Sequence, residues 1–335
     1  MNEVLKKEEN TSINLSKKQK RELKKTVGHM AWGLILYTII GIVISIIGAC
    51  VKECVSNPNW LNMTDEEIDE LFFSLEKQEF FGILSCAIVI IGVSFLFLYF
   101  RKCIDHRKMF FTYKKMTSQV FIQLLCVFLG VQLLTEPIFL LLEKSFNLFG
   151  YSVMSSMEDA KMGSLTLSML LYAVVLGPVA EELVYRGFVL FAIKKYGKVY
   201  AILISAFLFG LMHENIPQSV FAFMVGIILG FVAMEYSIWW AILLHIINNG
   251  LSDFLYYLTG NFSAGVQDGI CYMLFGGCFL FGLFFVWKKR VVIREYLIEN
   301  KPNKKILLYT LTTVGMLIFM IMETVAAFSM IEKLG

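Results

Sequence analysis

Two adjacent carboxylates, Glu181 and Glu182, and an arginine, Arg186, stand in a stretch of sequence that is otherwise apolar enough to span a membrane. A charged side chain at membrane depth costs about 2.5–3.5 kcal/mol on insertion scales, so such residues usually mark function. Glu182 and Arg186 are four residues apart, so they share one face of a helix and can neutralise each other. Glu181 lies about 100° away around the helix axis. It has no cation on its own face, which leaves it available for chemistry.

Two of the four histidines also fall within apolar stretches. His213 ends the run that begins at Phe209, and His245 stands four residues before Asn249, on the same face of a helix. A carboxylate such as Glu181 beside an imidazole can hold a water molecule and remove its proton. A second imidazole and a carboxamide are donors suited to an oxyanion. The residue types therefore predict hydrolysis of a carbonyl group, and specifically of a peptide bond within the membrane.

A zinc site is the alternative use of the same residues. Glu181, His213 and His245 could supply three ligands and leave a fourth position open for water. The metalloprotease pattern HExxH is absent, because His213 and Glu214 are not followed by the second histidine. We therefore favour a metal-free glutamate mechanism over a zinc mechanism, with the cofactor either absent or zinc.

The composition indicates the elements that carry these residues. Hydrophobic residues make up 57% of the chain and charged residues 17%, against about 45–50% and 25% in soluble domains. Long apolar runs recur, which predicts an all-α, polytopic transmembrane helical bundle of about eight or nine spans. The expected spans are 29–51, 80–100, 119–142, 164–196, 199–213, 218–234, 238–258, 269–287 and 306–330.

Local features refine three of these spans. The sequence Thr135-Glu136-Pro137 is expected to interrupt the third span, since proline cannot donate a backbone hydrogen bond. The fourth span is expected to run on to Tyr196, because Gly197 is the first good C-cap. Gly226 and Gly230 are spaced for close contact with another helix.

The charge distribution divides the chain and orients it. Residues 1–28 form a basic tail, and residues 29–163 hold the N-terminal spans with an acidic extracytoplasmic loop at 52–79. Within that loop, 64–79 is expected to form an amphipathic helix. Residues 164–259 are expected to form the catalytic membrane core, and residues 260–335 the C-terminal spans. Most Lys and Arg residues fall in alternate loops, so the positive-inside rule predicts a multi-pass protein of the cell membrane with a cytoplasmic N-terminus.

The depth of each candidate residue can be approximated from the helical rise. Glu181 and His213 are both about 21 Å from the inner surface, whereas His245 is only about 10 Å from it. Helix tilt could absorb this mismatch. Glu235 and Glu323 fall near predicted span ends, where solvation alone would explain them.

The three motifs EExxxR, FxxxH and HxxxN occur in order in successive apolar stretches. Over about residues 165–255 the chain resembles the CAAX-protease and bacteriocin-processing family of intramembrane proteases. The resemblance implies that Glu181 and His213 activate water and that His245 and Asn249 stabilise the oxyanion. Glu182 and Arg186 would support them.

The expected function is that of an intramembrane endopeptidase. Its partners would be membrane lipid and a membrane-presented peptide or protein tail, and no nucleic-acid partner is expected. One version of this function is processing of a prenylated CAAX tail. The other is maturation or destruction of a secreted peptide, with a role in bacteriocin self-immunity, and the lysine-rich and isoleucine-rich composition favours it. The alternative is a non-enzymatic membrane protein, either an immunity scaffold or a proton or solute pathway, although the two matching halves typical of transporters are not visible. A scaffold should tolerate Glu181→Gln.

Overall fold

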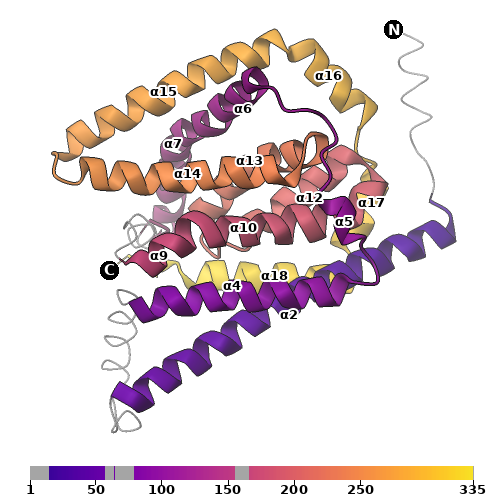
Figure 1. Cartoon of the computed structure of the whole chain (residues 1–335), viewed down its shortest axis with the longest axis horizontal. Coiled ribbons are helices and arrows are strands. Elements are labelled where there is room, and N and C mark those ends of the chain that lie inside the picture. The colour runs from indigo at the N-terminus through magenta and orange to yellow at the C-terminus, as the bar shows by residue number, and fades with distance from the viewer. Residues whose placement is uncertain (1–14, 57–63, 65–78, 155–165, 335) are drawn as a thin grey trace.

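The protein was analysed as a computed structural model, which describes residues 15–56, 64, 79–154 and 166–334. It is an all-α helical bundle, which confirms the predicted fold class (Figure 1). The expected helix at 64–79 lies outside the described residues, apart from its two ends. The elements are α2 (Lys17–Ser56), α4 (Glu79–Phe100), α5 (His106–Met109), α6 (Ser118–Gly130), α7 (Gln132–Asn147), β1 (Tyr151–Ser152), α9 (Leu167–Leu171), η2 (Tyr172–Leu176), α10 (Gly177–Glu182), η3 (Leu183–Leu190), α11 (Phe191–Ile193), η4 (Lys194–Tyr196), α12 (Lys198–Leu211), α13 (Ile216–Glu235), α14 (Ile238–Thr259), α15 (Ala264–Lys288), α16 (Arg290–Glu299), α17 (Lys304–Leu311), α18 (Val314–Ser329) and β2 (Glu332–Lys333).

Among the described residues, six helices are long and apolar enough to cross a membrane, and the bent pair α17–α18 would make seven. This count is below the eight or nine expected, for two local reasons. α12 has only 14 residues, whereas about 20 are needed to cross the hydrocarbon core. α14 has 22 residues, but it carries His245, Asn248, Asn249 and Asp253. The polar residues of the candidate site are thus what lowers the apolarity of α14.

The boundaries of the other helices correct three expectations. α2 has 40 residues and so is roughly 60 Å long, which carries it well into the basic tail. The third span breaks at Val131, between α6 and α7, and Pro137 lies inside α7. The last span bends by 68° between α17 and α18. The expected end of the fourth span is confirmed, because η4 ends at Tyr196 and Gly197 has a positive φ of 135°.

The helices form layers around α10. Figure 1 shows α10 between α14 on one side and α4 on the other, with α2 beyond α4, and these neighbours are in contact. At the opposite edge, α15 packs on α6 and α7. α15 has one buried residue, Gly282, so it lies outside the core. The strands β1 and β2 pair antiparallel, with Tyr151 opposite Lys333.

The hairpin of α12 and α13 is the tightest helix contact that bears on the site. A Cβ atom at Gly226 would lie 3.2 Å from Ala206, and one at Gly230 would lie 3.2 Å from Ile202. Both glycines therefore allow the two helices to approach closely, as their spacing predicts. The hairpin turn contains Glu214, whose φ of 51° is left-handed.

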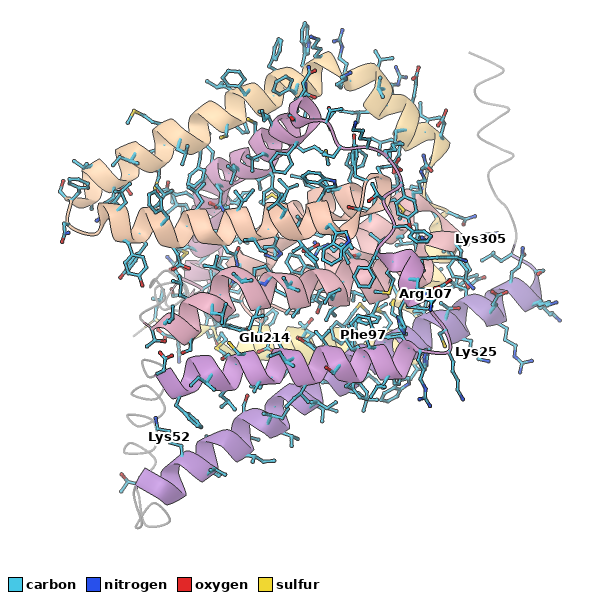
Figure 2. The ribbon with its side chains drawn as sticks, viewed as in Figure 1. Lys25, Lys52, Phe97, Arg107, Glu214 and Lys305 are labelled. Atoms are coloured by element: carbon cyan, nitrogen blue, oxygen red, sulfur yellow. The ribbon has the colours of Figure 1, made fainter. Side chains whose placement is uncertain are left out.

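The basic residues gather at one end of the bundle. Figure 2 shows Lys25, Arg107 and Lys305 at the same end, and Lys52 at the other. The three residues at one end belong to segments predicted to be cytoplasmic, and Lys52 belongs to the loop predicted to be extracytoplasmic. These four positions agree with the predicted alternation of loops.

Candidate active site

The fourth span, which carries the EExxxR motif, is not a uniform α-helix. The turns at Tyr172–Leu176 and Leu183–Leu190 are π-helical, and the α-helical segment α10 lies between them. Such π turns are rare and frequently lie at functional sites. They widen the helix on both sides of Glu181 and Glu182.

The first π turn leaves one carbonyl group free. The N–H of Gly177 donates to the carbonyl of Tyr172, rather than to Ala173 as it would in an α-helix. In the π register the next donor to Ala173 would be Pro178, which has no N–H. The Ala173 carbonyl is therefore available, and it accepts a hydrogen bond of 2.9 Å from the Asn249 side-chain amide. The sequence Gly177-Pro178 thus provides the free carbonyl that holds the Asn249 side-chain amide.

Glu182 lies at the centre of the buried charges. Its Oε1 accepts a hydrogen bond of 2.9 Å from Arg186 Nη1 and one of 3.0 Å from His245 Nδ1. The Glu182 and Arg186 side chains are both 0% exposed, which confirms the predicted ion pair. The guanidinium also donates to the Gly226 carbonyl at 3.3 Å. Glu182 therefore connects the motif helix to α14, a link that the sequence analysis did not include.

The second nitrogen of His245 faces Glu181. His245 Nε2 lies 3.6 Å from Glu181 Oε2. Because Nδ1 must donate to the Glu182 carboxylate, Nε2 and Oε2 would both be acceptors unless one of them holds a proton. A hydrogen on Nε2 makes this atom a donor, as an oxyanion site requires.

His213 also carries a hydrogen on Nδ1, but its partner there is a backbone carbonyl. Its Nδ1 lies 2.8 Å from the carbonyl oxygen of Phe209. A carbonyl can only accept, so Nδ1 carries the hydrogen and Nε2 of the neutral ring holds a lone pair. The Phe209 carbonyl is accessible because α12 ends at Leu211. The four-residue spacing of Phe209 and His213 therefore leaves His213 Nε2 able to accept a proton.

Glu181 is the least constrained member of the group. It makes no hydrogen bond with the described residues, and 22% of its side chain is exposed. A carboxylate and a neutral imidazole nitrogen are two acceptors of the kind that can hold a water molecule.

Phe209 packs between the charged groups. The Arg186 guanidinium carbon lies 4.2 Å from the centroid of the Phe209 ring. The rings of His213 and His245 meet the same ring edge-on, at 5.0 Å and 5.8 Å. The ring holds both imidazoles in place while its face stabilises the arginine. The first residue of the FxxxH motif is therefore part of the site.

A further polar chain positions Asn249, and the sequence analysis missed its first member. Gln132 Nε2 donates to Asn248 Oδ1 at 2.9 Å, and Asn248 Nδ2 donates to Asn249 Oδ1 at 3.2 Å. Gln132 is the first residue of α7, directly after the break at Val131. The same apolar stretch also contains Gln119 and Gln123, so the sequence alone did not single out Gln132.

The structure brings all six predicted residues to one location, between α12, α14 and the fourth span. It does not arrange them as metal ligands. No group of three His, Cys, Asp or Glu side chains in the described parts of the chain could hold a metal ion. His245 Nδ1 is bonded to Glu182 and His213 Nδ1 to a carbonyl, so only the Nε2 atoms of the two rings face the site.

Comparison with known proteins confirms the resemblance. Residues 163–251 match the family model described as type II CAAX prenyl endopeptidase Rce1-like. That range contains all three motifs, and the spans before and after it lie outside the match. No curated protein and no solved structure is significantly similar to the chain. The match supports, in general terms, a CAAX-type intramembrane endopeptidase in a multi-pass membrane protein.

Proposed function

We propose that this protein hydrolyses a peptide bond in a membrane-presented peptide or protein tail, with a water molecule activated by Glu181 and His213. The observation that carries the proposal is the pair of free acceptors, the Glu181 carboxylate and His213 Nε2, beside the donors of His245 and Asn249. The match to prenyl endopeptidases supports a tail with a lipid-modified cysteine as the substrate class.

The proposed reaction uses each group once. Glu181 and His213 hold a water molecule and take its proton as its oxygen bonds to the carbonyl carbon. The oxyanion that forms accepts hydrogen bonds from His245 Nε2 and from the Asn249 amide. The carbon–nitrogen bond then breaks, and the stored proton passes to the departing amine. Glu182 orients His245 through its bond to Nδ1, and Arg186 balances the charge of Glu182.

The decisive test is cleavage of a fluorogenic peptide whose prenylated cysteine is followed by three residues. Protein reconstituted in liposomes should cleave it, and Glu181→Ala or His213→Ala should lower kcat by about 10²–10⁴-fold. Both variants should remain folded, because Glu181 makes no hydrogen bond with the described residues and the ring of His213 is bonded only to a backbone carbonyl. Glu136→Ala, an exposed acid of α7, is the matched control and should cleave normally. Full cleavage by Glu181→Ala or Glu181→Gln would refute the mechanism. An absence of cleavage by the wild type, with the cellular phenotype intact in Glu181→Gln, would favour a scaffold.

The biological role and orientation belong to the same proposal. A role in peptide maturation or bacteriocin self-immunity predicts that a membrane peptide accumulates in cells carrying Glu181→Ala in place of the wild type. A cytoplasmic N-terminus predicts that an impermeant maleimide added outside intact cells labels a variant with only Cys50 and spares one with only Cys103. Both thiols are free and exposed. Cys50 lies near the end of α2 and Cys103 just after α4, so the predicted orientation puts them on opposite sides of the membrane. The reverse labelling would overturn the orientation.

A further inference from the structure

The helix α16 makes few contacts with the rest of the protein. It follows the long apolar helix α15 and bends away from it toward the end of the bundle at which Lys305 lies (Figure 1, Figure 2). In the described structure, every residue of α16 except Tyr296 is exposed. With ten residues, α16 is too short to cross the hydrocarbon core, which needs about 20. By its length, therefore, α16 lies at the membrane surface or in water.

Tyr296 fixes the rotation of α16 on the bundle. Its hydroxyl donates to Glu235 Oε1 at 3.0 Å, and its ring meets the Phe231 ring edge-on at 5.7 Å. Arg294 is two residues before Tyr296, so it lies about 200° away around the helix axis. The face that carries Arg294 therefore points away from the bundle.

The face around Arg294 combines cations with aliphatic side chains. Arg290 and Ile298 lie four residues from Arg294, on either side of it. Val291 and Leu297 lie three residues from it, on the same face. All five side chains are exposed, Ile298 at 62%. The aliphatic side chains would be unfavourable in water and the cations in hydrocarbon, so this face fits the boundary between the two.

An exposed tryptophan marks the start of α16. Trp287 lies near the end of α15 and is exposed, and tryptophan is enriched at the level of the lipid headgroups. The Arg290 guanidinium carbon lies 4.8 Å from the centroid of the Trp287 ring, and Arg290 Nη1 donates to the Trp287 carbonyl at 2.8 Å. These contacts place the first turn of α16 beside an interfacial residue.

The charge of this segment favours one class of lipid. Residues 288–305 contain seven Lys and Arg residues and two Glu residues. Both acids lie off the face of Arg294, because Glu295 is about 100° and Glu299 about 140° away around the axis. Basic residues next to a membrane-crossing helix are attracted to anionic headgroups, by about fivefold in affinity for each cation near the surface.

We propose that α16 lies in the membrane–water interface and binds the headgroups of anionic lipids through Arg290 and Arg294. The aliphatic side chains of the same face then insert between the lipids. The bond from Tyr296 to Glu235 connects this surface to the end of α13, which packs on α12. The inference is independent of the proposed function, because it requires no cleavage.

The test measures how anionic lipid protects a cysteine on this face. The full chain with Ile298→Cys is placed in nanodiscs of phosphatidylcholine with rising fractions of phosphatidylglycerol. Modification of residue 298 by a water-soluble maleimide, followed by mass spectrometry of its peptide, should slow as the anionic fraction rises. The fraction that gives half of the protection should increase about fivefold with Arg294→Gln and stay unchanged with Arg294→Lys.

Val292→Cys is the matched control. Val292 is also exposed, but it is four residues from Tyr296 and therefore on the side of α16 that faces the bundle. Its modification should not depend on the lipid. Arg294→Glu combined with Glu295→Arg keeps the net charge and puts an acid at the centre of the face, so this exchange should abolish the protection of Ile298→Cys.

Three results would overturn the inference. One is equal modification of Ile298→Cys in all nanodiscs, or protection that the exchange of Arg294 and Glu295 leaves intact. Another is protection that is already complete in pure phosphatidylcholine, which would assign no role to anionic headgroups. The third is protection in detergent that grows with protein concentration, which would assign the face to a second copy of the chain.

Discussion

Two buried glutamates of this protein, Glu182 and Glu235, have very different surroundings. Glu235 ends α13, is 3% exposed and accepts hydrogen bonds from Lys114, Lys198 and Tyr296. These partners come from three segments, and the two lysines reach water with side chains 63% and 46% exposed. Glu235 thus joins the ends of helices, and each of its oxygens has a donor.

Glu182 is buried completely, and its hydrogen bonding is incomplete. Both of its donors use Oε1, so Oε2 has no partner among the described residues, and neither does Nε of Arg186. Buried polar groups without partners are rare in folded proteins and call for an explanation. The contrast teaches that the acid that stabilises the fold is fully satisfied, whereas the acids of the candidate site retain unused hydrogen-bonding capacity.

The largest effect on this comparison should come from removing the central acid. Glu182→Met leaves the buried Arg186 and His245 without their anion, which should destabilise the protein by about 3–5 kcal/mol. Replacing both members of the pair, Glu182→Met with Arg186→Met, should cost less, because no buried charge remains unpaired. Thermal unfolding in detergent followed by circular dichroism measures both. A double variant less stable than the single one would contradict the assignment of the pair.

A smaller effect should follow from Glu235→Gln. Lys114 and Lys198 can turn to water, so the loss should be only about 1–2 kcal/mol, and peptide cleavage should persist. The hydrogen bond to Glu235 raises the pKa of Lys114. A raised lysine pKa contributes stability below the ordinary lysine value, and this contribution disappears as pH rises through the raised value. The difference in melting temperature between wild type and Glu235→Gln should therefore be constant from pH 6 to about 9 and shrink only at higher pH. A shrinking difference near pH 7 would show that Lys114 is not the partner.

The site shows where sequence reasoning succeeds. Residues at a spacing of four on one helix, such as Glu182 and Arg186, meet because helical geometry alone brings them together. The same rule relates Phe209 to His213 and His245 to Asn249. The depth argument was less useful, since it separated His245 from Glu181 by about 10 Å, whereas their side chains lie 3.6 Å apart. Helical rise describes one helix and says nothing about how two helices cross.

The sequence also misread two acids. Glu235 and Glu323 were expected to be solvated at span ends, yet both are 3% exposed. Glu323 lies within α18 and is 3.5 Å from the Thr38 hydroxyl of α2. Their burial depends on distant partners. Thr38 is 285 residues from Glu323 in the sequence, and Lys114 is 121 residues from Glu235. No local pattern reports such partners.

The sequence by itself determined the helical class, the membrane environment and the six residues that could do chemistry, because apolar runs and helical spacing are local properties. The tertiary structure decided what each residue is bonded to. It joined His245 to Glu182, and it left Glu181 and one nitrogen of His213 without a hydrogen bond among the described residues. These relations depend on how helices cross and where the π turns lie, and the free energy of that packing comes from contacts between distant segments.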